Sequence, residues 1–295
     1  MDHKPTADLF AILAAALYAV NIPLSKELLA HTGPTMMAAL LYLGAGLGLL
    51  LWGLGERAAG RDIRREPLTG RDLPYTAAMV VLDIAAPILL MMGIARTTSA
   101  NVSLLNNFEI AATSVIALLV FKETISRTLW MAIGLVTLSS ILLSFEGAGA
   151  FAFNRGSLLV LSACICWGFE NNCTKMLSSK SSVEIVTIKG CCSGLGSLCV
   201  ALALGEPLPE ARWIPAALLL GFVSYGLSIN FYILAQKGLG AAKTSAYYSV
   251  APFLGVAFSM LLLGERPNRF FYGALAVMAL GTGIMIRDSL HPRPE

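Results

Sequence analysis

The segment CWGFENNCTKML (166–177) places polar and ionisable side chains inside an otherwise apolar run. An ionised group at the centre of a membrane-spanning helix costs roughly 2.5–3.5 kcal/mol on insertion scales, so such groups normally face a cavity or a partner helix. At about 100° per residue, Trp167, Glu170, Asn171 and Thr174 fall on one stripe of this helix. An indole ring, a carboxylate and an amide on one stripe have the chemistry to bind a small polar solute.

A second stripe of the same kind occurs near the N-terminus. LYAVNIPLSK (17–26) aligns without gaps on the first ten residues of that segment, so Tyr18 pairs with Trp167 and Asn21 with Glu170. Both aromatic residues fall near the centres of their apolar runs, although Trp and Tyr usually prefer the membrane interfaces. The pairing indicates two opposite walls of a central cavity. Ordinary helix packing, with interhelical hydrogen bonds from Asn and Glu, is the alternative.

Other polar residues inside apolar runs complete the set of candidates. Asp83 stands in VVLDIAAP, one turn before Pro87, which predicts a bent helix with its carboxyl group facing the interior. Pro252 lies in another span, where it would free a backbone carbonyl. The residues expected to bind the substrate are Tyr18, Asn21, Asp83, Asn101, Trp167, Glu170, Asn171 and Tyr247. Those expected to serve packing are Asn106, Asn107 and Tyr248.

The composition predicts the elements that position these residues. Of 295 residues, 56% are hydrophobic and 13% are charged, whereas a soluble domain carries about 25% charged residues. With a mean hydropathy of +0.72, this indicates an all-α polytopic membrane protein. Ten transmembrane helices are predicted, at about 7–29, 34–54, 74–94, 99–121, 128–146, 156–178, 183–204, 213–235, 243–263 and 269–286.

The basic residues predict the orientation of the chain. With a cytoplasmic N-terminus, thirteen Lys and Arg fall in inside loops and five in outside loops. By the positive-inside rule, both termini are expected in the cytoplasm, with the protein in the cytoplasmic (inner) membrane. No basic run is interleaved with aromatic residues, so nucleic acid is not an expected partner. The sequence also predicts no metal site and no cofactor.

The two halves of the chain form a weak repeat. SANVSLLNNFEI...FKETISR (99–127) aligns with AAKTSAYYSVAP...LGERPNR (241–269). Each half holds an odd number of spans, so the second copy is inverted, as in many secondary transporters. We therefore expect a first five-helix repeat at 1–147 and an inverted one at 148–295, forming one membrane unit.

The halves resemble the EamA family of the drug/metabolite transporter superfamily. Each ends in an apolar–Glu–turn–Arg pattern before a last helix (FKETISR and LLGERPNR), and the family's Leu-Glu-Pro-like triplet appears as FEI (108–110) and VAP (250–252). FEI keeps Glu109 without the Pro and VAP keeps Pro252 without the Glu, which leaves the family role of Glu109 undefined. Within the family the chain looks closest to YddG-type exporters of aromatic amino acids, which implies export of aromatic and other neutral amino acids.

A zwitterionic amino acid requires donors for its carboxylate, acceptors for its ammonium group and an apolar pocket. The amides expected to contact it are Asn21, Asn101 and Asn171; the acids expected to meet its ammonium group are Glu170 or Asp83; the pocket residues are Trp167, Tyr18 and Tyr247. The halves would rock about this site. Proton coupling through Glu109, Glu170 or Asp83 and uniport without it are both compatible with the sequence.

Other function classes have less support. The nucleophile elbow and the HExxH zinc motif of enzymes are absent, and only one Asp lies mid-span, so no catalytic residue is expected. A channel would show a ring of filter residues, and none is evident. The expected partners are a small-molecule substrate and the lipid bilayer. A monomer and a homodimer both fit, because the GxxxG pairs of the chain serve internal packing or a dimer interface.

Overall fold

The computed structural model describes residues 5–58, 68–120, 122, 126–144, 154–177, 180, 182–239, 244 and 247–290. Its regular elements are helices, and no β-strand occurs in these ranges. The elements are α1 (Pro5–Ala19), α2 (Asn21–Leu28), α3 (Pro34–Ala58), η1 (Gly70–Asp72), α4 (Leu73–Ile94), α5 (Ser99–Leu105), α6 (Phe108–Leu119), α7 (Arg127–Ser144), α8 (Arg155–Met176), α9 (Ser182–Ala203), α10 (Trp213–Gly221), η2 (Phe222–Leu227), α11 (Ser228–Leu239), α13 (Ala251–Leu263) and α14 (Arg269–Leu290).

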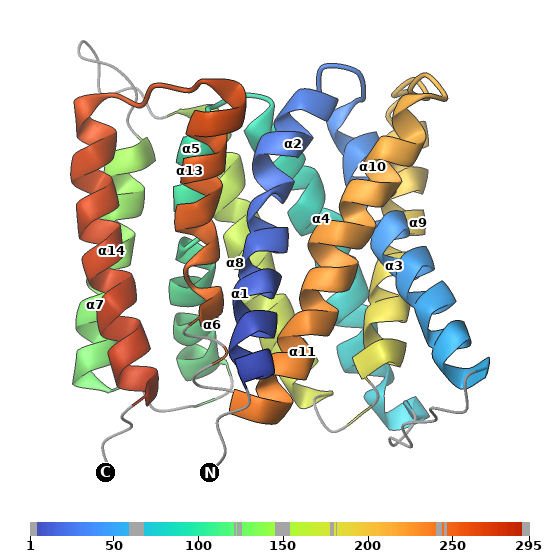
Figure 1. Ribbon diagram of the computed structural model, residues 1–295, viewed down its shortest axis with the longest axis horizontal. Helices are drawn as coiled ribbons and strands as arrows, with labels where there is room; N and C mark the ends of the chain where they lie inside the picture. The colour runs from blue at the N-terminus through green and yellow to red at the C-terminus, as the bar shows by residue number, and fades with distance from the viewer. Residues whose placement is uncertain are drawn as a thin grey trace.

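These helices stand side by side, and α1 begins at the same edge of the molecule at which α14 ends (Figure 1). We call this the terminal edge and the other the opposite edge. Eight helical stretches among the described residues are long and apolar enough to cross a membrane, and α13 is apolar but shorter. The protein is thus a multi-pass helical membrane protein, although the predicted count of ten spans is not confirmed. The helix α8 is not among the eight, because Glu170, Asn171, Asn172 and Lys175 lower its hydropathy.

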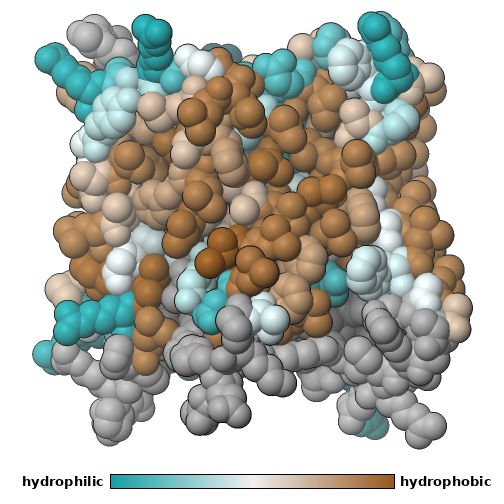
Figure 2. Space-filling model, viewed as in Figure 1, coloured by the Kyte–Doolittle hydropathy of each residue, from teal (hydrophilic) through white to brown (hydrophobic). Residues whose placement is uncertain are grey.

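The surface matches a lipid environment. Figure 2 shows apolar residues across the middle of one face, with hydrophilic residues gathered toward its upper corners. Leucines such as Leu51 and Leu261 are 69% and 78% exposed. In water such exposure would be unfavourable over a continuous band, whereas lipid tails solvate it.

Four of the expected spans are interrupted in the described part of the chain: the first, the fourth, the eighth and the ninth. The first divides into α1 and α2 because the ring of Pro23 conflicts with a helical carbonyl at Ala19, four residues earlier, where α1 ends. The fourth divides into α5 and α6 at Asn106 and Asn107. The eighth contains the π-helix η2, a feature often found at functional sites.

The two mid-span prolines differ in position: one lies inside a helix and the other at a helix start. The helix α4 continues through Pro87 over its whole length, from Leu73 to Ile94. Pro252 lies in the first turn of α13, where a helix tolerates proline because that N–H has no partner within the helix. Tyr248, four residues before Pro252, is helical and is followed by a turn at Ser249 and Val250, so the ninth expected span is interrupted here as the first is before Pro23.

Glycines bring the helices into close contact. A Cβ atom built on Gly44 would lie 2.0 Å from the carbonyl oxygen of Leu218 in α10, and one on Gly190 would lie 2.4 Å from the Cα of Gly46. The GxxxG pairs of α3 and α9 are thus used for packing within the chain, which allows the backbones to approach.

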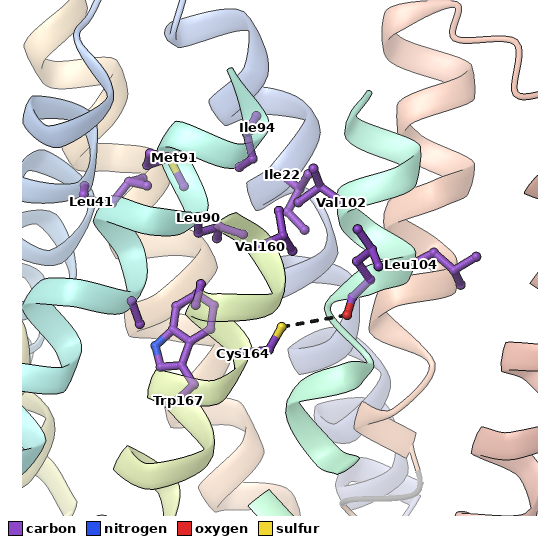
Figure 3. Packing of buried hydrophobic residues seen from close by; sticks show 14 of the residues in the cluster. Ile22, Leu41, Leu90, Met91, Ile94, Val102, Leu104, Val160, Cys164 and Trp167 are labelled. Atoms are coloured by element: carbon purple, nitrogen blue, oxygen red, sulfur yellow. Dashed lines mark hydrogen bonds between the residues drawn. The ribbon is translucent and has the colours of Figure 1, made fainter. Parts of the chain in front are cut away.

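The helix α8 lies against α4 and α6 and carries the central part of the core. Val160, Cys164 and Trp167 follow one face of α8, with Leu90 and Met91 of α4 beside them (Figure 3). This packing fixes the rotation of α8 and so determines which of its residues face inward.

Candidate functional site

A cavity of about 560 Å³ lies among α1, α3, α6, α8, α9, η2, α11 and the start of α13. Its lining residues come from α6, the C-terminal half of α8, the N-terminal half of α9 and α11, so the cavity extends from mid-depth toward the terminal edge (Figure 1). Small-molecule sites usually occupy roughly 300–1,000 Å³. The volume is therefore suited to a metabolite.

Aromatic side chains form much of its wall. Tyr225, from the π-helix η2, lies between Tyr18 and Tyr42, with ring centroids 6.0 and 5.5 Å apart respectively. The Tyr18 ring also lies 5.4 Å from that of Tyr248. With Trp167, these rings line the cavity and can pack against an apolar or aromatic group.

An ion cluster occupies one side of the cavity. Lys189 Nζ of α9 lies 3.2 Å from Asp83 Oδ2 of α4 and 3.0 Å from Glu170 Oε1 of α8. Tyr42 Oη donates to Asp83 Oδ1 at 3.0 Å, and Trp167 Nε1 donates to Tyr42 Oη at 3.4 Å. Asp83 is fully buried, so its charge depends on these contacts.

A second acidic group faces the cavity from α6. Asn171 Nδ2 of α8 donates to Glu109 Oε1 at 2.8 Å and to Thr113 Oγ1 at 3.2 Å. Glu109 forms no salt bridge with another residue in the described part of the chain. Among the described lining residues, the cavity thus has one cation, Lys189, which is paired with carboxylates, and a carboxylate, Glu109, whose side-chain partner is an amide.

The break between α5 and α6 also lines the cavity. Asn106 Nδ2 donates to Tyr18 Oη at 3.2 Å, and Asn107 Nδ2 donates to the Leu104 carbonyl at 3.4 Å. The Asn107 amide bonds the backbone locally, which competes with continued helix at this point, whereas Asn106 bonds a distant helix.

The structure brings four of the eight predicted substrate residues together at the cavity: Tyr18, Trp167, Glu170 and Asn171. The stripe Trp167, Glu170, Asn171 and Thr174 lines the cavity along its whole length, as does Tyr18 on the other wall. Thr174 Oγ1 also donates to Glu170, and Glu109 lines the cavity as well. Asp83 does not line the cavity, but it pairs with Lys189, which does.

Three predicted contacts lie away from the cavity lining. Asn21 is buried and donates to Tyr225 Oη at 2.9 Å, so it positions an aromatic wall. Asn101 is buried near the opposite edge, where its Nδ2 donates to the Leu143 carbonyl at 3.1 Å. Tyr247 bonds Asp8 at the terminal edge, and its neighbour Tyr248 takes the position on the cavity wall.

Sequence reasoning missed Lys189, Tyr42 and the cavity position of Asn107. Lys189 carried a usable signal, since a Lys seven residues inside an apolar span is rare and usually functional. Tyr42 and Asn107 carried none, because an isolated polar residue in a span is compatible with either packing or a cavity.

Contacts between the two halves of the chain close the opposite edge. Glu206, in the connection between α9 and α10, accepts from the backbone N–H groups of Thr35 and Met36 at 3.1 and 2.8 Å. Glu265, after α13, accepts from those of Ser99 and Ala100 at 2.8 Å each. Each carboxylate caps a helix N-terminus of the other half, an arrangement that the helix dipole favours.

Lys26 lies at the same edge. Its Nζ donates to the carbonyl of Ile94, the last residue of α4, at 2.5 Å and to that of Thr97, just after the helix, at 2.7 Å. These contacts satisfy carbonyls that α4 leaves without partners, as cations near helix C-termini commonly do.

Comparisons with known proteins show which family the chain is similar to. The model of the EamA-like transporter family matches residues 5–145 and 154–287. An uncharacterized transporter of Methanothermobacter thermautotrophicus is 26% identical over 290 residues, covering 93% of this chain and 84% of that protein. Another, of Vibrio cholerae, is 30% identical over 145 residues, or 45% of each chain. A protein of known crystal structure shares the fold with a TM-score of 0.66, at 15% identity over 96% of both chains.

Proposed function

Since this chain belongs to the EamA-like transporter family, we propose that it is a secondary transporter that exports small amphipathic metabolites, in particular aromatic and other neutral amino acids. The observation that carries the proposal is the cavity of about 560 Å³, which combines aromatic walls with amide groups and charges of both signs. A zwitterion with an aromatic side chain requires these three kinds of partner in one place.

The cavity chemistry supports this substrate class in detail. Lys189 and the tyrosine hydroxyl groups offer donors to a carboxylate, and the rings of Tyr18, Tyr42 and Trp167 offer an aromatic pocket. Carboxylate and amide oxygens of the cavity offer acceptors to an ammonium group.

Transport would proceed by alternating access between the two inverted five-helix repeats. The cavity extends toward the terminal edge, and the caps of Glu206 and Glu265 close the opposite edge. In the proposed orientation, the protein lies in the inner membrane and both termini face the cytoplasm. The cavity then extends toward the cytoplasm, so the state described is the one that loads substrate for export. Proton coupling through Glu109, Glu170 or Asp83 belongs to the same proposal and would show as flux driven by a pH gradient.

Purified protein in liposomes loaded with labelled phenylalanine or tryptophan tests the proposal. We expect saturable efflux that follows the substrate gradient. Flux that never saturates would indicate a channel, and no flux for any amino acid would overturn the substrate assignment.

Trp167→Ala provides the matching structural test. This change removes a cavity wall, and we expect efflux to fall at least tenfold while the protein still inserts, because binding residues in central pockets contribute most of the binding energy. Phe169→Ala on the same helix is the control, since Phe169 is 38% exposed and lies outside the lining. Equal transport by both variants would assign Trp167 to packing.

A further inference from the structure

The break between α5 and α6 holds a polar atom without a partner. Asn107 is 1% exposed, lines the cavity, and its Oδ1 atom has no hydrogen-bond partner among the described residues. Leaving a buried acceptor unpaired costs roughly 1–3 kcal/mol, so such an atom is usually explained by a ligand or by water. The Nδ2 atom of the same amide donates to the Leu104 carbonyl, so Oδ1 is its unpaired atom.

Glu109 follows two residues later, in the first turn of α6, and also lines the cavity. Asn171 Nδ2 donates to its Oε1 atom, whereas Oε2 forms no hydrogen bond or salt bridge with any residue that the structure describes. Both residues line the cavity, so their oxygens are two acceptors that a positively charged donor in the cavity can satisfy.

The other acids of the site are already engaged. Asp83 and Glu170 share Lys189, and Tyr42 and Thr174 donate further hydrogen bonds to them. Two carboxylates on one ammonium group leave a formal charge of −1 on this cluster when all three groups are ionised. Glu109 adds a second negative charge, and no other Lys or Arg occurs among the described residues of the lining.

Aromatic rings complete the surroundings of this wall. Asn106, next to Asn107, donates to Tyr18 Oη, and the Tyr18 ring lies 5.4 Å from the Tyr248 ring. Ammonium groups bind over such rings through cation–π attraction.

We propose that Asn107 and Glu109 form the subsite for the substrate's ammonium group, in place of Glu170 or Asp83, which the sequence favoured. This inference rests on the proposed function, because it assigns one end of the proposed substrate. It implies that an aromatic amine without a carboxylate binds through the subsite, and that an aromatic acid without an amine does not depend on it.

Ligand-induced thermal stabilisation of the full chain in detergent tests the subsite without requiring transport. The ligands are phenylalanine, phenethylamine, which lacks the carboxylate, and 3-phenylpropionate, which lacks the amine. We expect all three to raise the unfolding temperature of the wild type. Glu109→Gln keeps the shape and removes the charge, and Asn107→Leu removes the free acceptor at similar volume. Each should increase the amine concentration required for a given rise in unfolding temperature by roughly tenfold or more, because hydrogen bonds to charged groups are stronger than those between neutral groups.

Asn172→Leu is the control, because Asn172 is a buried amide of α8 that does not line the cavity and donates to the backbone carbonyls of Thr113 and Gly168. It should lower stability and keep the response to all three ligands. An unchanged amine response in Glu109→Gln would overturn the subsite, even if Asn107→Leu failed to insert. So would equal losses for phenethylamine and 3-phenylpropionate, or a wild type that no amine stabilises. Failure of the proposed function is distinct: phenylalanine would bind, yet liposomes would show no efflux.

Discussion

Lys189 bridges two buried carboxylates, and its removal should be the most damaging single change at the ion cluster. Lys189→Met leaves Asp83 and Glu170 without their cation, and breaking a buried ion pair in this way costs about 3–5 kcal/mol. We expect a clear loss of the folded fraction after heating, measured by size-exclusion chromatography in detergent. Lys175→Met is the control on the neighbouring helix, because that side chain is exposed.

The combined variant Lys189→Met with Asp83→Asn sharpens this prediction. Removing one of the two uncompensated carboxylates should recover part of the lost stability, because the penalty arises from buried charge. If Lys189→Met were as stable as the wild type, the cluster would not be an ionic network.

At the scale of single residues, the sequence predicted the stripe on α8 for a simple reason. A helical period and the cost of charge in lipid together determine which face of a span turns inward. The partners of that face depend on how α9 and α4 pack against α8, which no local pattern encodes. Lys189 is an example. The sequence shows that it lies inside a span, whereas only the packed structure shows its ion pairs with Asp83 and Glu170.

Close helix packing depends on glycine at particular positions, and a matched pair of glycines tests this. Gly44→Ala would place a methyl group 2.0 Å from the Leu218 carbonyl oxygen of α10, so backbones must shift. Such overpacking typically costs 1–3 kcal/mol. Gly134→Ala in α7 meets no atom within 4 Å and should be neutral or stabilising by about 0.5–1 kcal/mol, because alanine is the better helix former. The same heating assay would compare them, and equal stability of the two variants would contradict the close contact.

The interruptions of the helices were only partly predictable. Pro23 is a local signal, since its ring must end a helix near Ala19. Pro87 is the same residue type and leaves α4 unbroken, so the type alone does not decide the outcome. The break at Asn106 and Asn107 and the π-helix η2 depend on side-chain bonds and on packing around the cavity, which a span-by-span interpretation does not contain.

For the whole molecule, composition and apolar runs were sufficient to predict a multi-pass helical protein, and the family match confirms the broader class. The number of spans was less predictable, because α8 carries the polar groups of the site and loses hydropathy for that reason. The two inverted repeats stay a prediction. Their motion, however, has a direct consequence at the opposite edge.

The caps of Glu206 and Glu265 should bias the molecule toward closure at that edge. The change to Gln removes the charge and leaves one acceptor oxygen in place of two, which weakens each cap by roughly 1 kcal/mol. The double variant should therefore raise the fraction of molecules open at the opposite edge several-fold. The test is labelling of a cysteine introduced at Thr113 of the cavity wall, after replacement of the six native cysteines, by an impermeant maleimide.

Labelling in right-side-out and inside-out vesicles identifies the side of access. We expect the Glu206→Gln, Glu265→Gln variant to react faster from the side of the opposite edge and more slowly from the terminal edge, because opening one side closes the other in alternating access. Glu210→Gln is the control, since Glu210 lies in the same connection as Glu206 and pairs only with Arg212, at 2.7 Å on the surface. Faster labelling from both sides at once would indicate a leak through the molecule, and unchanged rates would show that these carboxylates do not hold the edge closed.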